Sequence, residues 1–210
     1  MLVERFAAIL ALLSGATAFI PSSIQSARST SLKMSAEGLA GAIAPTGFFD
    51  PAGLSNGKTD AEMKKIREAE LKHGRLAMLA TLGVLVGEKF NPLFDGKVTG
   101  PAIYQFQQCD ALFPAFWTFV VLGVGFVEGQ NILVGWDQKP GKDGISNLKE
   151  EYVNGDLGFD PLGLKPTDDE AFEVMRTKEL QNGRLAMIGI AGMVAQELVN
   201  NKGIFENLGL

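Results

Sequence analysis

A stretch that occurs twice constrains this chain more than any other feature of its sequence. The first copy is Ala69–Glu88 (AELKHGRLAMLATLGVLVGE), and the second, 109 positions later, is Lys178–Glu197 (KELQNGRLAMIGIAGMVAQE). Each copy opens with a Glu and an Arg and then stays apolar for about fifteen residues, as in a helix that carries charge into a membrane. The fold therefore contains two equivalent helices whose charges need partners.

The shared charges predict how these two helices pack. An ionised side chain near the middle of a bilayer costs about 3 kcal/mol on insertion scales, so the charges should face each other inside a bundle. The duplication permits two crossed ion pairs, Glu70 with Arg184 and Glu179 with Arg75. Small residues that let the two backbones approach lie beside these charges: Gly74, Ala77, Gly183 and Ala186. We therefore expect the two helices to cross.

A second polar residue follows each Glu by three positions, His73 in the first copy and Asn182 in the second. Three residues turn an α-helix by about 300°, so each Glu and its neighbour lie on one side and can present lone pairs outward. Carboxylate, amide and imidazole atoms can all ligate a metal ion. The patterns ExxHGRxAM and ExxNGRxAM resemble the first and third transmembrane helices of the light-harvesting chlorophyll-binding family.

This resemblance implies a set of pigment ligands. In that family the Glu and the His or Asn of each motif are axial ligands to the magnesium of chlorophyll, and the Arg of the other helix neutralises the ligating Glu. By position, the implied ligands are Glu70, His73, Glu179 and Asn182, with Arg75 and Arg184 as the neutralising partners. A Glu shared between magnesium and Arg leaves no unbalanced charge in lipid, which agrees with this assignment.

Two further ligands are implied by the same resemblance. Gln196 follows Asn182 by nearly four helical turns, about 21 Å along the same face, where the family has a ligating Gln. Glu128 matches a ligating Glu of the central helix, although the family's Arg three residues on is Asn131 here and its earlier Gln is Val120. Glu128 would then need another counter-charge. The alternatives are a polar residue at head-group level for Gln196 and an interfacial Glu for Glu128.

A second repeated pair of segments precedes the two helices. Gly47–Leu54 (GFFDPAGL) and Leu157–Leu164 (LGFDPLGL) each combine the turn formers Asp and Pro with an apolar anchor. The matching loops of the family hold the end groups of two carotenoids, which implies that Asp50 and Asp160 lie near a carotenoid head. The alternative is simply a repeated turn.

The segment between the two copies predicts a further span. Ala115–Val134 is apolar apart from Glu128, and it is long enough to cross a bilayer. Basic residues before both repeats indicate that both helices enter from one side, which requires this returning span. We expect an all-α membrane protein with three transmembrane helices, at about 60–88, 114–134 and 168–200. The first and third would be crossed and related by a pseudo-two-fold axis, with the N-terminus stromal and the C-terminus lumenal if the family topology holds.

The N-terminal residues have the composition of targeting segments. Residues 1–18 combine Arg5, an apolar run and Ala16-Thr17-Ala18, which is typical of a signal peptide. Residues 19–36 are rich in Ser, contain two basic residues and lack acidic ones, which is typical of a transit peptide. The combination resembles the bipartite address of algae with complex plastids of red-algal descent, and it leaves 37–210 as the chlorophyll-binding domain. An ordinary secreted protein with a Ser-rich linker is the alternative.

Composition narrows the partners. With 24 acidic against 19 basic residues the chain gives no case for nucleic-acid binding, and its single Cys excludes an intrachain disulfide. Short connections, no extra lumenal helix and the red-lineage address make the chain most similar to fucoxanthin chlorophyll a/c proteins. The resemblance implies a non-enzymatic antenna of the plastid thylakoid membrane that binds chlorophyll a, chlorophyll c and fucoxanthin or related carotenoids. Its implied partners are a photosystem core, other antenna subunits and thylakoid lipids, in a homo- or hetero-oligomer or alone.

Two other functions fit parts of the sequence. A member of the same family could dissipate energy for photoprotection, with acids such as Glu197 and Glu206 sensing acidification of the lumen. More remotely, Glu70-x-x-His73 matches an element of di-iron carboxylate enzymes. The second copy has Asn182 in place of a His, and the chain has only one His.

Overall fold

A computed structural model describes residues 40–43, 47–140 and 146–209, all of which belong to the compact unit Ser35–Leu210. The predicted signal and transit segments lie outside the described residues. The elements are α2 (Asp60–Lys89), η3 (Leu93–Gly96), α3 (Ala102–Leu112), α4 (Phe116–Gly135), β1 (Trp136–Pro140), β2 (Ser146–Leu148), α5 (Asp169–Asn200) and α6 (Ile204–Asn207). The described part is therefore mostly helical, with one short antiparallel hairpin that the sequence analysis did not predict.

The two long helices that contain the repeats begin at polar caps. Thr59 and Glu62 form a capping box at the start of α2, in which the Thr59 backbone N–H donates to the Glu62 carboxylate at 2.8 Å. The Asp168 carboxylate accepts from the Ala171 N–H at 3.0 Å at the start of α5. Asn201, in the left-handed region with φ 53°, ends α5. Local sequence therefore fixes where both helices begin.

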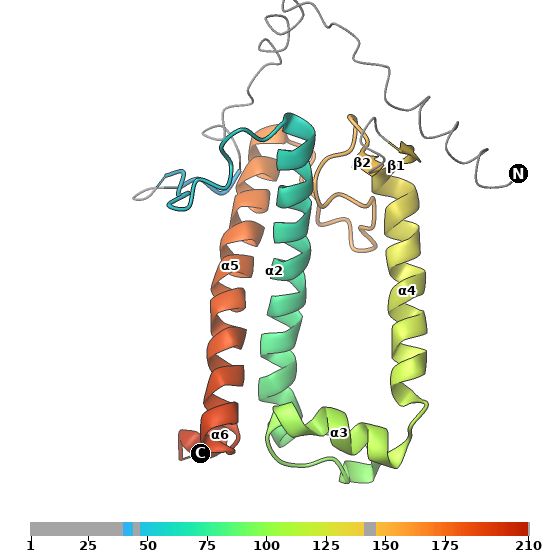
Figure 1. The fold of residues 1–210 in the computed structure, drawn as a ribbon, viewed down its shortest axis with the longest axis vertical. Coiled ribbons are helices and arrows are strands. Elements are labelled where there is room, and N and C mark those ends of the chain that lie inside the picture. Colours follow the sequence, from blue (N-terminus) through green and yellow to red (C-terminus); the bar gives the residue numbers. More distant parts are fainter. Residues whose placement is uncertain (1–39, 44–46, 141–145, 210) are drawn as a thin grey trace, which may run out of the picture. The chain divides into compact units, whose positions relative to one another are not determined.

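Helices α2 and α5 run side by side and contact each other through their smallest residues (Figure 1). A Cβ placed on Gly74 would lie 3.0 Å from the Cα of Gly183, so the two backbones touch at these equivalent positions. Leu71, Ala77 and Leu180 are buried along the same contact. This close approach brings the charged residues of each repeat within reach of the other helix.

Two short helices, α3 and α6, follow α2 and α5 respectively, and the sequence analysis predicted neither. Each is capped by the Glu that ends a repeat. Glu88 of α2 accepts hydrogen bonds from the N–H groups of Ile204 and Phe205, at 2.6 and 3.0 Å, at the start of α6. A carboxylate at these N–H groups satisfies donors that no helical carbonyl reaches.

Glu197 of α5 makes the equivalent contact with α3. Its carboxylate accepts from the Ile103 N–H at 2.8 Å, and the residue is only 1% exposed. Glu197, one of the acids that the photoprotective interpretation assigns to sensing acidification, is therefore buried beneath the start of α3. Glu206, in α6, is exposed, and its carboxylate lies 3.8 Å from the Lys202 ammonium.

Helix α4 differs from the repeats in composition. It is the one helix among the described residues that is long and apolar enough to cross a membrane by length and composition. Helices α2 and α5 do not meet that criterion because their first halves are rich in charged residues. The predicted arrangement of three spans therefore stays a prediction.

A buried carboxylate ties the connection between α4 and α5 to α2. Glu68 is 5% exposed, and it accepts hydrogen bonds from the Tyr152 hydroxyl, the Asn154 amide and the Gly155 N–H, at 3.0, 3.2 and 3.0 Å. Three donors compensate the cost of burying this charge. The loop that precedes α5 is thereby held against the charged half of α2.

Candidate functional site

The two crossed ion pairs predicted from the repeats are confirmed. Arg184 Nε lies 2.7 Å from Glu70 Oε1, and Arg75 Nε lies 2.7 Å from Glu179 Oε1. The four side chains are between 26% and 38% exposed. Each helix therefore neutralises the other, and each carboxylate keeps an accessible side.

Each arginine also donates to a glycine carbonyl in the loop that precedes the other helix, a contact that could not be predicted from the sequence. Arg184 Nη1 donates to the Gly41 carbonyl at 2.9 Å, and Arg75 Nη2 donates to the Gly155 carbonyl at 2.8 Å. Gly41 and Gly155 have φ of +93° and +80°, a conformation that residues with a Cβ rarely tolerate. The two guanidinium groups are thus fixed from both sides in the same way.

The two crossed ion pairs differ in one respect, because among the described residues Glu70 pairs with a second arginine and Glu179 does not. Arg67 Nη1 lies 2.8 Å from Glu70 Oε2, so Glu70 has two arginine partners. The residue equivalent to Arg67 is Arg176, which pairs instead with Glu173 at 2.5 Å. No described residue donates to Oε2 of Glu179. The two ligand candidates therefore differ in how many lone pairs remain available.

His73 and Asn182 are oriented alike by their own helices. His73 Nδ1 lies 2.7 Å from the Ala69 carbonyl, and Asn182 Nδ2 donates to the Lys178 carbonyl at 2.9 Å. Because a carbonyl can only accept, Nδ1 of His73 carries the proton and Nε2 keeps its lone pair. Asn182 likewise keeps its Oδ1 free, and both residues are exposed. This donor set fits a magnesium ligand held by an outer hydrogen bond.

Glu128 of α4 has a counter-charge that the sequence analysis left open. Its Oε2 forms an ion pair with the ammonium of Lys72 on α2, and its Oε1 accepts from the Asn131 amide at 3.3 Å. In the sequence Lys72 is one of several basic residues ahead of the apolar part of the first repeat, and nothing in its sequence context points to α4. Gln196 is half-buried on α5, and its side chain has no hydrogen-bond partner among the described residues.

The carboxylates of Asp50 and Asp160 fold their own loops. Asp50 accepts from the Leu54 N–H and from the N–H and hydroxyl of Ser55 at 3.0, 2.8 and 2.6 Å. Asp160 accepts from the N–H groups of Leu164 and Lys165 at 3.0 and 2.9 Å. These bonds favour the ionised form and lower the pKa of both carboxyls, through Ser55 for Asp50 and through the Lys165 N–H for Asp160.

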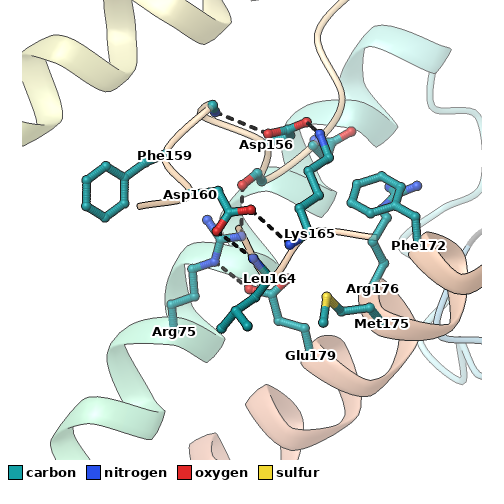
Figure 2. A pocket seen from close by; sticks show the side chains of 13 residues that line it. Arg75, Asp156, Phe159, Asp160, Leu164, Lys165, Phe172, Met175, Arg176 and Glu179 are labelled. Atoms are coloured by element: carbon teal, nitrogen blue, oxygen red, sulfur yellow. Dashed lines mark hydrogen bonds and ion pairs between the residues drawn. The ribbon is translucent and has the colours of Figure 1, made fainter. Parts of the chain in front are cut away.

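A cavity of about 430 Å³ lies between one crossed pair and the second of these loops (Figure 2). Arg75 and Glu179 form one wall, and Asp160 and Lys165 come from the loop. Lys165 Nζ lies 2.5 Å from Asp156 Oδ2, and this bond lowers the pKa of the Asp156 carboxyl. The apolar side chains of the lining are Phe159, Leu164, Phe172 and Met175. A ligand there would meet an apolar surface beside a neutralised charge pair.

These features define a helical protein built on a duplicated pair of helices that neutralise each other and present hard oxygen and nitrogen donors outward. The family model described as "Chlorophyll A-B binding protein" matches residues 35–198, and the chain belongs to this family. Its members are non-enzymatic, light-harvesting, helical membrane proteins. The alternative interpretation as a di-iron carboxylate enzyme is therefore wrong.

Curated relatives fall into two groups. The chain is 52% identical over 178 residues to the light-harvesting complex stress-related protein 3.2, chloroplastic, of Chlamydomonas reinhardtii, covering 82% of this chain and 67% of the relative. It is 48% identical over 169 residues to the fucoxanthin-chlorophyll a-c binding protein, chloroplastic, of Isochrysis galbana, covering 79% and 78%. The fucoxanthin-chlorophyll a-c binding protein of Chattonella marina var. antiqua is 36% identical over 95% of this chain and 90% of the relative.

Proposed function

We propose that this chain is a light-harvesting protein of the plastid thylakoid membrane that binds chlorophylls and carotenoids and passes excitation energy to a photosystem. The observation that carries the proposal is the reciprocal pair of ion pairs beside outward-facing donor atoms. Gly74 and Gly183 already let the two backbones touch, so close packing of the helices does not by itself require these charges. They neutralise carboxylates that must remain ionised to bind a metal.

The residues have separate tasks. The residues that would ligate chlorophyll magnesium are Glu70, His73, Glu128, Glu179, Asn182 and Gln196. The arginines Arg75 and Arg184 orient two of the carboxylates and balance their charge, and the hydrogen bonds within α2 and α5 orient His73 and Asn182. Bound chlorophyll supplies the absorption of light, and the helices hold the pigments at fixed separations. Asp50 and Asp160 shape the loops beside the end groups of carotenoids.

The membrane arrangement is part of the same proposal. Helices α2, α4 and α5 would span the bilayer, with the N-terminus stromal and the C-terminus lumenal. Residues 1–18 and 19–36 would serve as signal and transit peptides. Chlorophyll a, chlorophyll c and a carotenoid of the fucoxanthin type are the proposed pigments, supported by the 48% identity to the Isochrysis galbana protein. A photosystem core and other antenna subunits are the proposed partners.

Dissipation of excess energy is a second candidate function, and a specific observation favours it. Three relatives at 50% to 52% identity are named stress-related light-harvesting proteins. Both functions use the same pigment sites, so the ligand set does not separate them. They differ in how long the excited state lasts.

Two measurements on the purified full chain test these proposals. Pigment extraction gives the chlorophyll and carotenoid content, and a protein that binds iron and no pigment would overturn both candidates. Fluorescence lifetime at neutral and at acid pH then separates them. A lifetime that does not change with pH favours harvesting, and a lifetime that shortens strongly in acid and recovers at neutral pH favours dissipation.

A further inference from the structure

An ion pair joins α4 to α2 at the point where the sequence departs from the family pattern. The ammonium of Lys72 pairs with Oε2 of Glu128, and these side chains are 34% and 46% exposed. Where the family commonly has an Arg three residues after the Glu, this chain has Asn131, whose amide donates to Oε1 at 3.3 Å. An amide supplies a hydrogen bond but no charge. Within the described part of the chain, Lys72 is the only cation that pairs with Glu128.

Glu128 needs the positive charge that Lys72 supplies. It lies seven residues before the end of α4, about 10 Å from the helix terminus, in an otherwise apolar segment. In a membrane the exposed side of this pair would face lipid or pigment, where a carboxylate without a counter-charge is unfavourable. The ammonium of Lys72 balances that charge and holds the Glu128 carboxylate in position.

Glu70 and Glu179, the other two proposed glutamate ligands, also have a cation on another helix as counter-charge. Each of the three proposed glutamate ligands pairs with a cation on a different helix: Glu70 with Arg184 on α5, Glu179 with Arg75 on α2, and Glu128 with Lys72 on α2. Glu70 has a second partner, Arg67, on its own helix. Helix α2 thus supplies cations to both neighbours. The two arginine pairs are also held by close backbone packing of α2 and α5, whereas α4 lacks such an approach to α2.

We propose that Lys72 is a positioning residue for the Glu128 pigment site, replacing the missing arginine by reaching across from α2. This inference rests on the proposed function. Each oxygen of Glu128 has one protein donor, so each keeps a lone pair for the metal. The site then depends on the ion pair between α4 and α2.

The test compares full-length variants reconstituted with chlorophylls and carotenoids. Lys72→Met removes the charge at nearly the same length, and Lys72→Arg keeps it. Lys65→Met is the matched control, because Lys65 lies on the same helix and forms no ion pair with a described residue. The double variant Lys72→Met with Glu128→Gln separates charge from packing, because a neutral amide oxygen can ligate magnesium without a counter-charge. Chlorophyll per polypeptide and the circular dichroism of the pigments are measured.

Loss of an outer partner lowers metal affinity about 10- to 100-fold, so Lys72→Met should lose about one chlorophyll per polypeptide. Lys72→Arg and Lys65→Met should keep the full complement, and the double variant should regain the lost pigment. The inference is overturned if Lys72→Met keeps every pigment, or if the double variant fails to recover. It is also overturned if Glu128→Leu loses no chlorophyll, while the proposed function stands. Only a wild-type chain that binds no chlorophyll would overturn the proposed function itself.

Discussion

Gly183 and Gly74 occupy equivalent positions in the two repeats, and a Cβ built on Gly183 would lie 2.9 Å from the Cα of Gly74. Real Cβ atoms do not approach a backbone this closely, so neither position accepts a larger residue without movement of a helix. The contact lies one residue before Arg75 and Arg184. It therefore sets the separation across which the two crossed ion pairs close.

Gly74→Ala and Gly183→Ala should each destabilise the folded protein. Forcing a methyl group into a close-packed contact costs about 1–3 kcal/mol, although alanine favours a helix over glycine by about 1 kcal/mol. Gly83→Ala and Gly192→Ala are matched controls, since a Cβ added at either position of this second equivalent pair would meet nothing within 4 Å. Thermal unfolding of the pigment-bound protein measures the difference. Equal behaviour of the two pairs would contradict the close backbone contact at Gly74 and Gly183.

The contact between Tyr152 and Glu68 predicts a loss of stability in alkali. Burial of the hydroxyl, followed by the charge of Glu68 and the hydrogen bond to it, raises the pKa of Tyr152 from 10.0 to about 12. A raised folded-state pKa means that the stabilisation is complete below pH 10 and is lost as pH rises toward 12. The connection between α4 and α5 should then detach from α2.

Tyr152→Phe isolates this effect, because it removes the titrating group and leaves the ring. The variant should be less stable at neutral pH, as Glu68 loses one of three donors, by about 1–3 kcal/mol. Its stability should fall less steeply than that of the wild type between pH 10 and 12. Denaturant titrations across this pH range measure both quantities. Parallel curves for the two proteins would refute the assignment.

Removing the Asp160 carboxylate should loosen the loop before α5. Asp160→Ala leaves the N–H groups of Leu164 and Lys165 without their acceptor, so their amide hydrogens should exchange faster. If the loop holds a carotenoid end group, the variant should also bind less carotenoid. Asp137→Ala is the control, since Asp137 accepts only from Lys139 in the hairpin. Faster exchange with unchanged carotenoid content would limit Asp160 to shaping the turn.

The crossed ion pairs could be predicted because the duplication places complementary charges at equivalent positions, which leaves few ways to pair them. The orientation of His73 and Asn182 follows from helix periodicity alone. The burial of Glu197 and its hydrogen bond to α3 could not be predicted from the sequence. Its partner, the Ile103 N–H, lies 94 residues away in a short helix whose own N-cap residue makes no side-chain hydrogen bond. A carboxylate that caps another element looks like a solvated acid in the sequence.

Lys72 escaped prediction for a related reason. A run of basic residues before an apolar segment is typical of a membrane-flanking region, and that interpretation assigns no partner to any single member. The pairing becomes visible only when α4 is placed beside α2. The substitution of Asn131 for an arginine was the available signal that some other cation must serve Glu128.

The most direct test of the account is the chlorophyll content of Arg184→Leu and Arg75→Leu. Removing Arg184 leaves Glu70 with Arg67 alone, and removing Arg75 leaves Glu179 without a cation among the described residues. Arg184→Leu should lose chlorophyll at Glu70, and Arg75→Leu should lose it at Glu179. The loss should be larger for Arg75→Leu, because Glu179 then has no cation left among the described residues. Arg176→Leu, which breaks the pair with Glu173 and the contact with the Phe172 ring but neither crossed ion pair, should keep both of these chlorophylls. A full chlorophyll complement in both Arg75→Leu and Arg184→Leu would contradict the claim that these helices neutralise each other to hold pigment.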